Sequence, residues 1–271
     1  MVSEILFKFN FFGFIFSDKN VNLPNQIYKT MAEIFKKLIL LGRPASGKSE
    51  VIDYLKKSIP DDRLKRFHIG KIDEIDDFPM LWTWFEEDAI LEKKFGKPRM
   101  HSTPDGYFLY EYQWHLLIER ICFEYMKRIR DKENYHNDTT CLIEFSRGTE
   151  HGGYKEAFKH LSPEVLKDSA ILYVNVPYEE SLRKNRKRFN PNKPDSILEH
   201  GLPDSKLERL YKEVDWKEVA SGSTSHININ GFDVPFVVFE NMPSKTDDPG
   251  LLGPALDDVL KRLWKIYKGS N

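Results

Sequence analysis

The 271-residue sequence has little cysteine, almost no net charge and no apolar run long enough to cross a membrane. Its two cysteines, Cys122 and Cys141, lie in apolar stretches without metal-ligand spacing, which excludes a disulfide scaffold and a cysteine zinc site. The 41 basic and 42 acidic side chains nearly cancel, so the chain as a whole is not attracted to nucleic acid or to an anionic membrane. These features predict a cytoplasmic protein.

The first thirty residues differ from the rest because phenylalanine is concentrated in residues 7–16. Lys8 and Asn10 interrupt this stretch, which offers about half of the roughly 20 apolar residues that a membrane span needs. Its first charged residue is Glu4, whereas a signal peptide starts with basic residues. We therefore predict a single folded domain over residues 31–271, which begins near Met31. The alternative is that residues 1–30 add an edge strand or an anchoring peptide.

Strand-like and helix-like patterns alternate along residues 31–271. Strands are expected at residues 38–41, 64–72, 140–145 and 170–176, with a strand pair between 226 and 240; helices are expected at 48–58, 80–95, 110–132, 178–189, 204–219 and 254–267. The third and fourth strands are apolar enough to be buried on both faces, as parallel strands between helices are. This order predicts the α/β class, with a three-layer, doubly wound, mostly parallel sheet.

The octapeptide GRPASGKS directly follows the first apolar strand and is typical of a phosphate-binding loop. The amphipathic helix that follows supplies the expected context. Gly42 and Gly47 permit backbone turns that aim successive N–H groups at one anion. Lys48 would reach the β- and γ-phosphates of ATP, and the Ser49 hydroxyl would bind Mg²⁺. The residues expected to hold the nucleotide are Gly42, Arg43, Pro44, Ala45, Ser46, Gly47, Lys48 and Ser49.

Charged residues near the ends of the second and third strands are candidates for the rest of the site. Glu144 is placed where open α/β sheets bind their ligands and could hold Mg²⁺. Arg147 could clamp a phosphate on the acceptor, although Glu144 and Arg147 could instead pair or cap the next helix. In the acidic set after the second strand, Asp73 is a candidate base for an acceptor hydroxyl, and Asp77 is suited to cap a helix.

Five of the six residues from 183 to 188 are basic. Because no acidic residue interrupts them, we favour a mobile lid whose arginines neutralise the transferring phosphoryl group. A solvated helix face and a nucleic-acid patch are the alternatives. Arg183 and Arg186 are assigned to catalysis, and Arg188 to nucleotide binding.

Aromatic residues between the second and third strands could stack on a planar acceptor, although about half of them should belong to the core. They are Trp82, Trp84, Phe85 and Tyr107, and the isolated histidines His101, His115 and His151 receive no role.

Two short strings are similar to guanine-reading motifs: NKPD at residues 192–195 and DDPG at 247–250. Their order is inverted for a GTPase, and NKPD does not follow an apolar strand. We therefore expect both strings to form turns.

With these motifs in order, the chain resembles P-loop kinases of the nucleoside monophosphate kinase type, especially adenylate kinases and deoxynucleoside kinases. The likeness spans residues 36–190 and includes the loop, the sequence EFSRG and the basic helix after the fourth strand. The resemblance implies that helices after the second strand bind the acceptor. It also implies that Arg147 is the acceptor arginine, that Glu144 stands near the metal, and that the lid residues are Arg183, Arg186 and Arg188.

We therefore expect an ATP- and Mg²⁺-dependent phosphotransferase that acts on a small acceptor, either a nucleotide or a nucleoside. Neither a membrane nor a nucleic acid is the expected partner. Two other functions stay open: a nucleotide-binding regulatory or partner-binding protein with little turnover, and a kinase of nucleic-acid ends.

Overall fold

The computed structural model describes residues 33–188, 192 and 201–270. The chain divides into two units, Met1–Thr30 and Met31–Asn271. The predictions for the phenylalanine-rich segment and for residues 193–195 of the NKPD string lie outside the described residues. In the described ranges, no helix combines the length and the apolar character that a membrane crossing requires.

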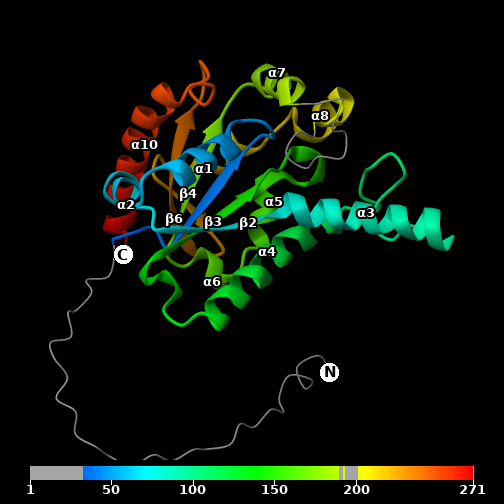
Figure 1. Cartoon of the computed structure of the whole chain (residues 1–271), viewed down its shortest axis with the longest axis horizontal. Helices are drawn as coiled ribbons and strands as arrows, with labels where there is room; N and C mark the ends of the chain where they lie inside the picture. Colours follow the sequence, from blue (N-terminus) through cyan, green and yellow to red (C-terminus); the bar gives the residue numbers. More distant parts are fainter. Residues whose placement is uncertain (1–32, 189–191, 193–200, 271) are drawn as a thin grey trace, which may run out of the picture. The chain divides into compact units, whose positions relative to one another are not determined.

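A six-stranded sheet with the strand order β2-β3-β1-β4-β6-β5 forms the centre of the second unit (Figure 1). Its strands are β1 (Lys37–Gly42), β2 (Lys71–Asp76), β3 (Thr139–Phe145), β4 (Ser169–Asn175), β5 (His226–Ile229) and β6 (Phe232–Glu240). Neighbouring strands are parallel except for the antiparallel pair of β5 and β6. The expected mostly parallel sheet is confirmed, and β1 lies between β3 and β4.

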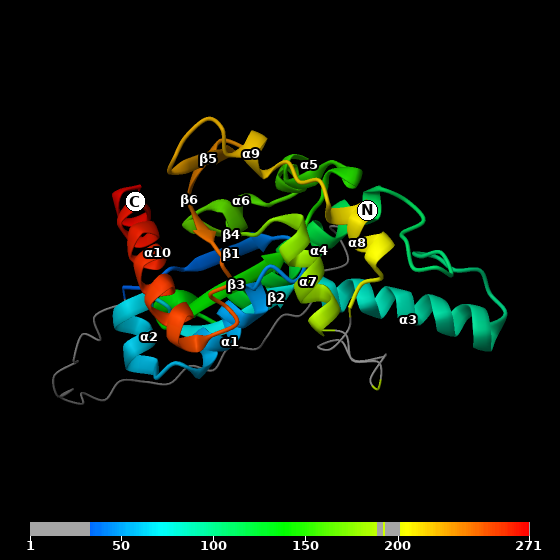
Figure 2. The same ribbon diagram turned by 90° about the horizontal axis from the view of Figure 1, so that it is seen from above.

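Helices cover both faces of this sheet (Figure 2). They are α1 (Lys48–Lys57), α2 (Pro60–Phe67), α3 (Asp77–Phe95), α4 (Tyr112–Asp131), α5 (Gly153–Lys159), α6 (Pro163–Leu166), α7 (Tyr178–Arg188), α8 (Asp204–Tyr211), α9 (Trp216–Val219) and α10 (Pro249–Gly269), with 3-10 turns η1 (Tyr135–Asn137) and η2 (Thr149–His151). Leu38 and Leu40 of β1 share a core with α1, α2 and α10, whereas Ile39 and Leu41 share another with α4, α5 and α6. This alternation gives the three layers that were predicted.

The second strand lies further along the chain than expected, so its predicted range is wrong. Residues 60–67 form α2, because Pro60 starts the first turn and Asp61 and Asp62 follow it, which favours a helix N-terminus. The true strand, β2, is an edge strand with the polar sequence KIDEID. This shift moves Asp73 into the strand and places Asp76 at its carboxyl end.

Two other element boundaries also differ from the expectation. The region 204–219 contains two helices, α8 and α9, rather than one. Helix α10 starts at Pro249 rather than at residue 254, because the Asp248 side chain accepts a hydrogen bond from the Gly250 amide and so caps the helix. The DDPG string is therefore a helix start rather than a free turn.

Candidate functional site

The glycine-rich loop turns sharply after β1, as the sequence predicted. Gly42 and Gly47 have positive φ angles of 149° and 112°. A Cβ atom on Gly42 would lie 2.5 Å from the Val174 carbonyl oxygen of β4, and one on Gly47 would lie 2.8 Å from Nδ2 of Asn241. Both positions therefore require glycine, for conformational and for steric reasons.

Lys48 opens α1, and its ammonium group lies inside the loop. The Nζ atom donates to the carbonyl oxygens of Gly42 (3.2 Å) and Arg43 (3.0 Å) and to the Ser146 hydroxyl (2.8 Å). It also lies 3.7 Å from a Glu144 carboxylate oxygen. Burial lowers the pKa of Lys48, while the charge of Glu144 opposes this shift. An ammonium held mainly by neutral oxygens at a helix N-terminus is well placed to bind phosphate oxygens.

The residue directly after β6 holds the loop in place through hydrogen bonds. Asn241 is fully buried, and its Nδ2 atom donates to the Ser46 carbonyl oxygen and to the Thr246 hydroxyl, each at 2.8 Å. The Arg43 side chain points out of the loop and donates to backbone carbonyls of Val176 (2.9 Å), Tyr211 (3.1 Å) and Lys212 (3.0 Å). Arg43 therefore joins the loop to the end of α8.

Three carboxylates meet near the ends of β2 and β3. Glu74, Asp76 and Glu144 each offer an oxygen atom, and these atoms lie within 4.8 Å of one another. Asp76 and Glu144 are direct partners in the parallel register. Clustered carboxylate oxygens suit a hard divalent cation such as Mg²⁺. Ser49 lines the same cavity as two members of this cluster, Asp76 and Glu144.

Ionisation of Asp76 and Glu144 is unfavourable because both are largely buried and lie beside other carboxylates. Burial is the main cause that raises the pKa of Asp76 to about 8, and the charges of Glu144 and Asp77 raise it further. The Phe78 amide, which donates to Asp76 at 3.0 Å, opposes this shift. Burial likewise raises the pKa of Glu144, against the attraction of Lys48. A bound cation would stabilise the ionised forms.

Arg147 is buried in the wall of the site, with only 3% of its surface exposed. Its Nη1 atom donates to the Asp77 carboxylate and to the Ser146 carbonyl, each at 2.6 Å, and its Nη2 atom donates to the Trp114 carbonyl at 3.1 Å. The guanidinium also lies over the Trp114 ring. Arg147 thus pairs with Asp77 rather than with Glu144, and its charge is already balanced.

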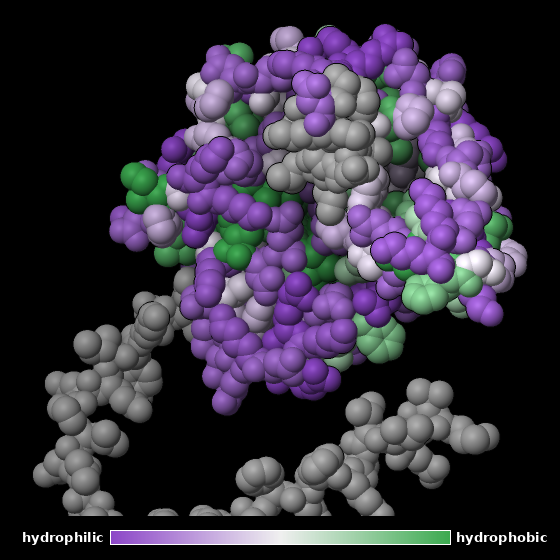
Figure 3. All heavy atoms as spheres, turned by 45° about the vertical axis from the view of Figure 1, so that its right-hand side comes forward, coloured by the Kyte–Doolittle hydropathy of each residue, from purple (hydrophilic) through white to green (hydrophobic). Residues whose placement is uncertain are grey.

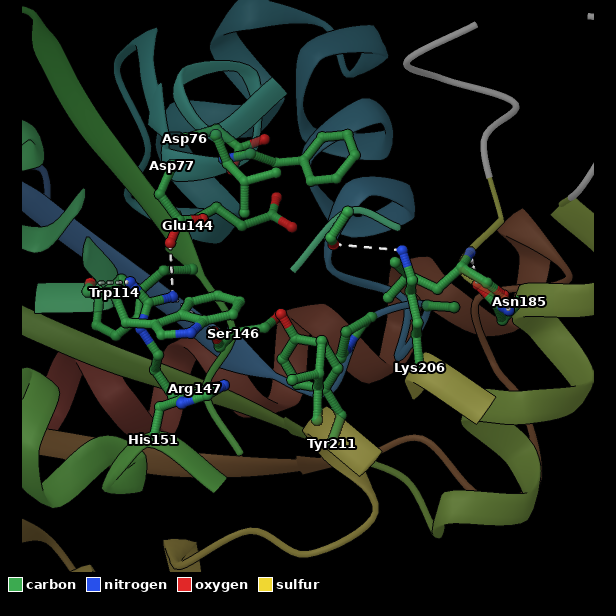
Figure 4. Close-up of a pocket in the computed structure, with 18 of the residues that line it drawn as sticks. Asp76, Asp77, Trp114, Glu144, Ser146, Arg147, His151, Asn185, Lys206 and Tyr211 are labelled. Atoms are coloured by element: carbon green, nitrogen blue, oxygen red, sulfur yellow. Dashed lines mark hydrogen bonds and ion pairs between the residues drawn. The ribbon is translucent and has the colours of Figure 1, made fainter. Parts of the chain in front are cut away.

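A cavity of about 300 Å³ extends from the loop to α8 (Figure 4). Much of its wall is aromatic, with Phe78, Phe85, Tyr107, Phe108, Trp114, His151 and Tyr211. Of the four aromatic residues proposed for stacking, Phe85 and Tyr107 line the cavity, whereas Trp84 stacks on His101 with ring centroids 4.9 Å apart. On the face of the molecule that Figure 3 views, apolar surface lies in recesses between hydrophilic residues.

His151 received no role from the sequence, yet it lines the cavity and stacks on Trp114 with ring centroids 5.0 Å apart. Burial lowers its pKa, which favours the neutral imidazole. No local pattern marked His151, because its partner Trp114 lies in a different helix.

The basic helix α7 has acidic partners, contrary to the expectation from its sequence. Arg183 contacts Asp247 at 3.0 Å, and Arg186 contacts Asp204 at 2.6 Å. Arg183 also pairs with Glu180 at 2.7 Å, three residues earlier in the same helix. Asp247 and Asp204 lie outside α7, so the pattern of the helix alone did not show them. Neither Arg183 nor Arg186 lines the cavity, whereas Arg188 does.

Asp73 is not brought to the cavity. It accepts hydrogen bonds from Nε of Arg128 (3.1 Å) and from the Tyr135 hydroxyl (2.7 Å) on the side of the sheet that α4 covers. Asp76 occupies the strand end at which Asp73 was expected. Asp76 also caps α3 through the Phe78 amide, a role that the sequence suggested for Asp77.

Comparisons with known proteins give only distant structural similarity. No protein-family model matches the chain, and no curated protein matches it significantly. Similar solved structures are Kti12 of Chaetomium thermophilum in complex with ADP-AlF3 (13% identity, 84% of this chain and 97% of that chain, TM-score 0.44) and shikimate kinase of Acinetobacter baumannii in complex with shikimate (14% identity, 70% and 78%, TM-score 0.34). A sugar kinase of Janibacter sp. is similar at 12% identity over 84% of this chain and 97% of that chain, with a TM-score of 0.37.

These similarities are too weak to assign an activity, so the assignment of the fold depends on the geometry of the chain itself. A central parallel β1 is followed by the loop GRPASGKS, by α1 and by a buried Lys48. Together with helices on both sheet faces, these features make this a three-layer α/β protein with the P-loop NTPase fold.

Proposed function

We propose that the protein is an ATP- and Mg²⁺-dependent phosphotransferase whose acceptor is a small molecule, a nucleotide or a nucleoside. One observation carries this proposal: Lys48 and Ser49 of the phosphate-binding loop line the same cavity as Asp76 and the aromatic wall. A triphosphate on the loop and a second small molecule in the cavity would therefore meet. Holding two reactants in contact is the main requirement for phosphoryl transfer.

The residues divide into a donor side and an acceptor side. On the donor side, Lys48 and the loop amides would bind the phosphates, and Arg188 would approach them from α7. Ser49 and Glu144 would hold Mg²⁺, which when bound neutralises charge on the phosphates. On the acceptor side, we assign to Asp76 the proton-accepting role for which Asp73 was first considered. The aromatic wall would exclude water.

The test is the rate of ADP formation by the full-length protein with a panel of nucleosides, nucleotides and oligonucleotides. We expect a small acceptor to stimulate ADP formation, and removal of Mg²⁺ to abolish it. Glu144→Gln should raise the Mg²⁺ concentration needed for half-maximal rate by about ten-fold, whereas Glu124→Gln on α4 should not.

The same panel distinguishes the alternatives. If ATP binds in calorimetry but no acceptor stimulates turnover, a regulatory or partner-binding protein is the better description. If only oligonucleotides stimulate turnover, the chain acts on nucleic-acid ends.

A further inference from the structure

Three hydrogen bonds hold the Lys48 ammonium inside the phosphate-binding loop. Its acceptors are the carbonyl oxygens of Gly42 (3.2 Å) and Arg43 (3.0 Å) and the Ser146 hydroxyl (2.8 Å). An ammonium group has three N–H donors, so these bonds use all of them. A phosphate oxygen can therefore bind Lys48 only if one of the three acceptors is released. A released acceptor that is left without another donor lowers the affinity for the phosphate.

The Gly42 carbonyl has a second donor that lies outside the loop. The Tyr154 hydroxyl donates to this carbonyl at 3.1 Å, and it accepts a hydrogen bond from the Gly42 amide at 3.0 Å. The Arg43 carbonyl also has a second donor, the Ser46 amide at 3.2 Å, but this amide belongs to the loop that is expected to face the phosphates. Of the three acceptors, the Gly42 carbonyl lies farthest from the ammonium. Its release should therefore cost the least.

Tyr154 is held firmly at the start of α5. Its side chain is fully buried, and its ring packs edge-on against the rings of Tyr173 and Trp216, with centroids 6.1 Å apart in each pair. Its backbone amide donates to the Asp215 carboxylate at 2.9 Å. Burial raises the pKa of the Tyr154 hydroxyl well above its usual range, so the hydroxyl keeps the proton that it donates. Tyr154 does not line the cavity, so it can affect a ligand there only through the loop.

We infer that Tyr154 is a positioning residue for triphosphate binding: its hydroxyl keeps the Gly42 carbonyl hydrogen-bonded when the Lys48 ammonium moves to a phosphate oxygen. This inference rests on the proposed function, because a triphosphate must bind to the loop for the exchange to occur. The exchange breaks the hydrogen bond from Lys48 to Gly42 and forms one from Lys48 to the phosphate, and no proton is transferred. Without the hydroxyl, the same exchange would leave the buried Gly42 carbonyl without either donor.

The test measures ATP binding by calorimetry, with full-length protein and Mg²⁺. The variant Tyr154→Phe keeps the ring and removes the hydroxyl, so it should raise the Kd for ATP by about ten-fold. Tyr173→Phe is the matched control. Tyr173 is also buried and packs against Tyr154, but it shares no hydrogen bond with the loop residues that the structure describes. Its substitution should leave the Kd within about two-fold.

The Lys48→Met background distinguishes positioning from a purely structural role. No ammonium has to leave Gly42 in that background, so adding Tyr154→Phe should change the Kd for ATP by less than about two-fold. The effect on stability should have the opposite order. In the otherwise unmodified chain, Lys48 still binds the Gly42 carbonyl after Tyr154→Phe, whereas Lys48→Met removes this donor as well. In urea unfolding, Tyr154→Phe should therefore destabilise the Lys48→Met protein more than the unmodified chain.

Several results would overturn the inference. They are an unchanged Kd for ATP in Tyr154→Phe, an equal rise in Tyr173→Phe, and a Tyr154→Phe effect on Kd or on stability that is the same in both backgrounds. A Tyr154→Phe protein that fails to fold would also contradict it, because Lys48 should still hold Gly42. Failure of the unmodified chain to bind ATP would contradict the proposed function itself, whereas the other results contradict only the role of Tyr154.

Discussion

Strand β1 has a buried lysine near each of its ends, and the two differ in what lies beside them. Lys37, 3% exposed, starts the strand, and Lys48, 4% exposed, follows the loop at its other end. The Lys37 ammonium donates to the Tyr125 hydroxyl at 3.2 Å and lies 5.0 Å from the centre of the same ring. The Lys48 ammonium faces a cavity. Burial of a charge therefore does not mark a binding site unless space for a ligand adjoins it.

We call the Lys37 end of β1 the closed end and the Lys48 end, which adjoins the cavity, the open end. At the closed end the buried polar groups bond to one another. The Tyr125 hydroxyl lies 2.9 Å from Nε2 of His136, and Nδ1 of His136 lies 3.1 Å from the Thr139 carbonyl oxygen. Burial lowers the pKa of Lys37 to about 8 and that of His136 to about 4. A complete internal network leaves no group for a ligand. The open end instead holds carboxylates that repel one another, which favours binding of a cation.

Replacing each lysine with methionine tests this contrast most strongly. Lys48→Met should lower turnover by about 100- to 1,000-fold, because a preorganised charge on the phosphates is lost. Lys37→Met should leave turnover within about two-fold, because its network does not reach the cavity. Steady-state assays of both purified variants provide the measurement. Similar losses in the two variants would contradict the distinction between the ends.

The ion pair of Arg147 and Asp77 gives the largest expected change in stability at the open end. Arg147→Met leaves the Asp77 carboxylate buried and unpaired, which should cost about 3–5 kcal/mol in the free energy of unfolding. The double variant Arg147→Met with Asp77→Asn should recover part of that loss. Urea unfolding of the three proteins measures both effects. If Arg147→Met lowered the free energy of unfolding by less than about 1 kcal/mol, the ion pair with Asp77 would not be a structural requirement.

The pH dependence of stability sharpens the contrast at the closed end. An unfolded Lys37 titrates near 10.5 and the folded one at about 8, so the folded state binds this proton more weakly. Below pH 8 the buried charge costs about 3 kcal/mol, and this cost disappears as the pH rises from 8 to 10.5. The stability advantage of Lys37→Met over the unmodified chain should shrink over that range. An advantage independent of pH would show that the pKa of Lys37 does not change on folding.

The smallest effect is expected where a charge is exposed. Arg186 and Asp204 have 62% and 49% of their side-chain surfaces exposed, so solvent screens their ion pair and its contribution to stability should be small. Arg186→Ala should therefore change neither the unfolding midpoint nor turnover by much. A loss of turnover of about ten-fold or more would instead support the lid role predicted from the sequence.

The sequence predicted the parts of the fold that depend on residues adjacent in the chain. The loop, β1 and α1 follow from one continuous pattern, and β3 and β4 are apolar enough to be recognised as buried strands. The edge strand β2 was misplaced because only one of its sides is paired, which allows a polar sequence. Because of that error, the sequence analysis placed Asp73 rather than Asp76 at the end of the strand.

The site was harder to predict because its contacts join distant segments. Arg147 was found from the sequence, but its partner Asp77 lies on another element, as does Trp114, whose carbonyl it also binds. The aromatic wall combines residues of α3, of the segment before α4, of α4, of η2 and of α8. Helix α7 has acidic partners in α1, in α8 and in the segment before α10. Only the packed sheet brings these residues together.

Asn241 connects the phosphate-binding loop to the segment before α10, so binding at the loop should be detectable in that segment by hydrogen exchange. Its Oδ1 atom accepts hydrogen bonds from the amides of Lys245 (2.8 Å) and Thr246 (3.3 Å), while its Nδ2 atom donates to the Ser46 carbonyl. Stiffening of the loop by a bound triphosphate should therefore slow deuterium uptake at residues 245 and 246, far from the loop in sequence. This short peptide would serve as a built-in reporter of loop occupancy, including in variants that bind ATP but do not turn over.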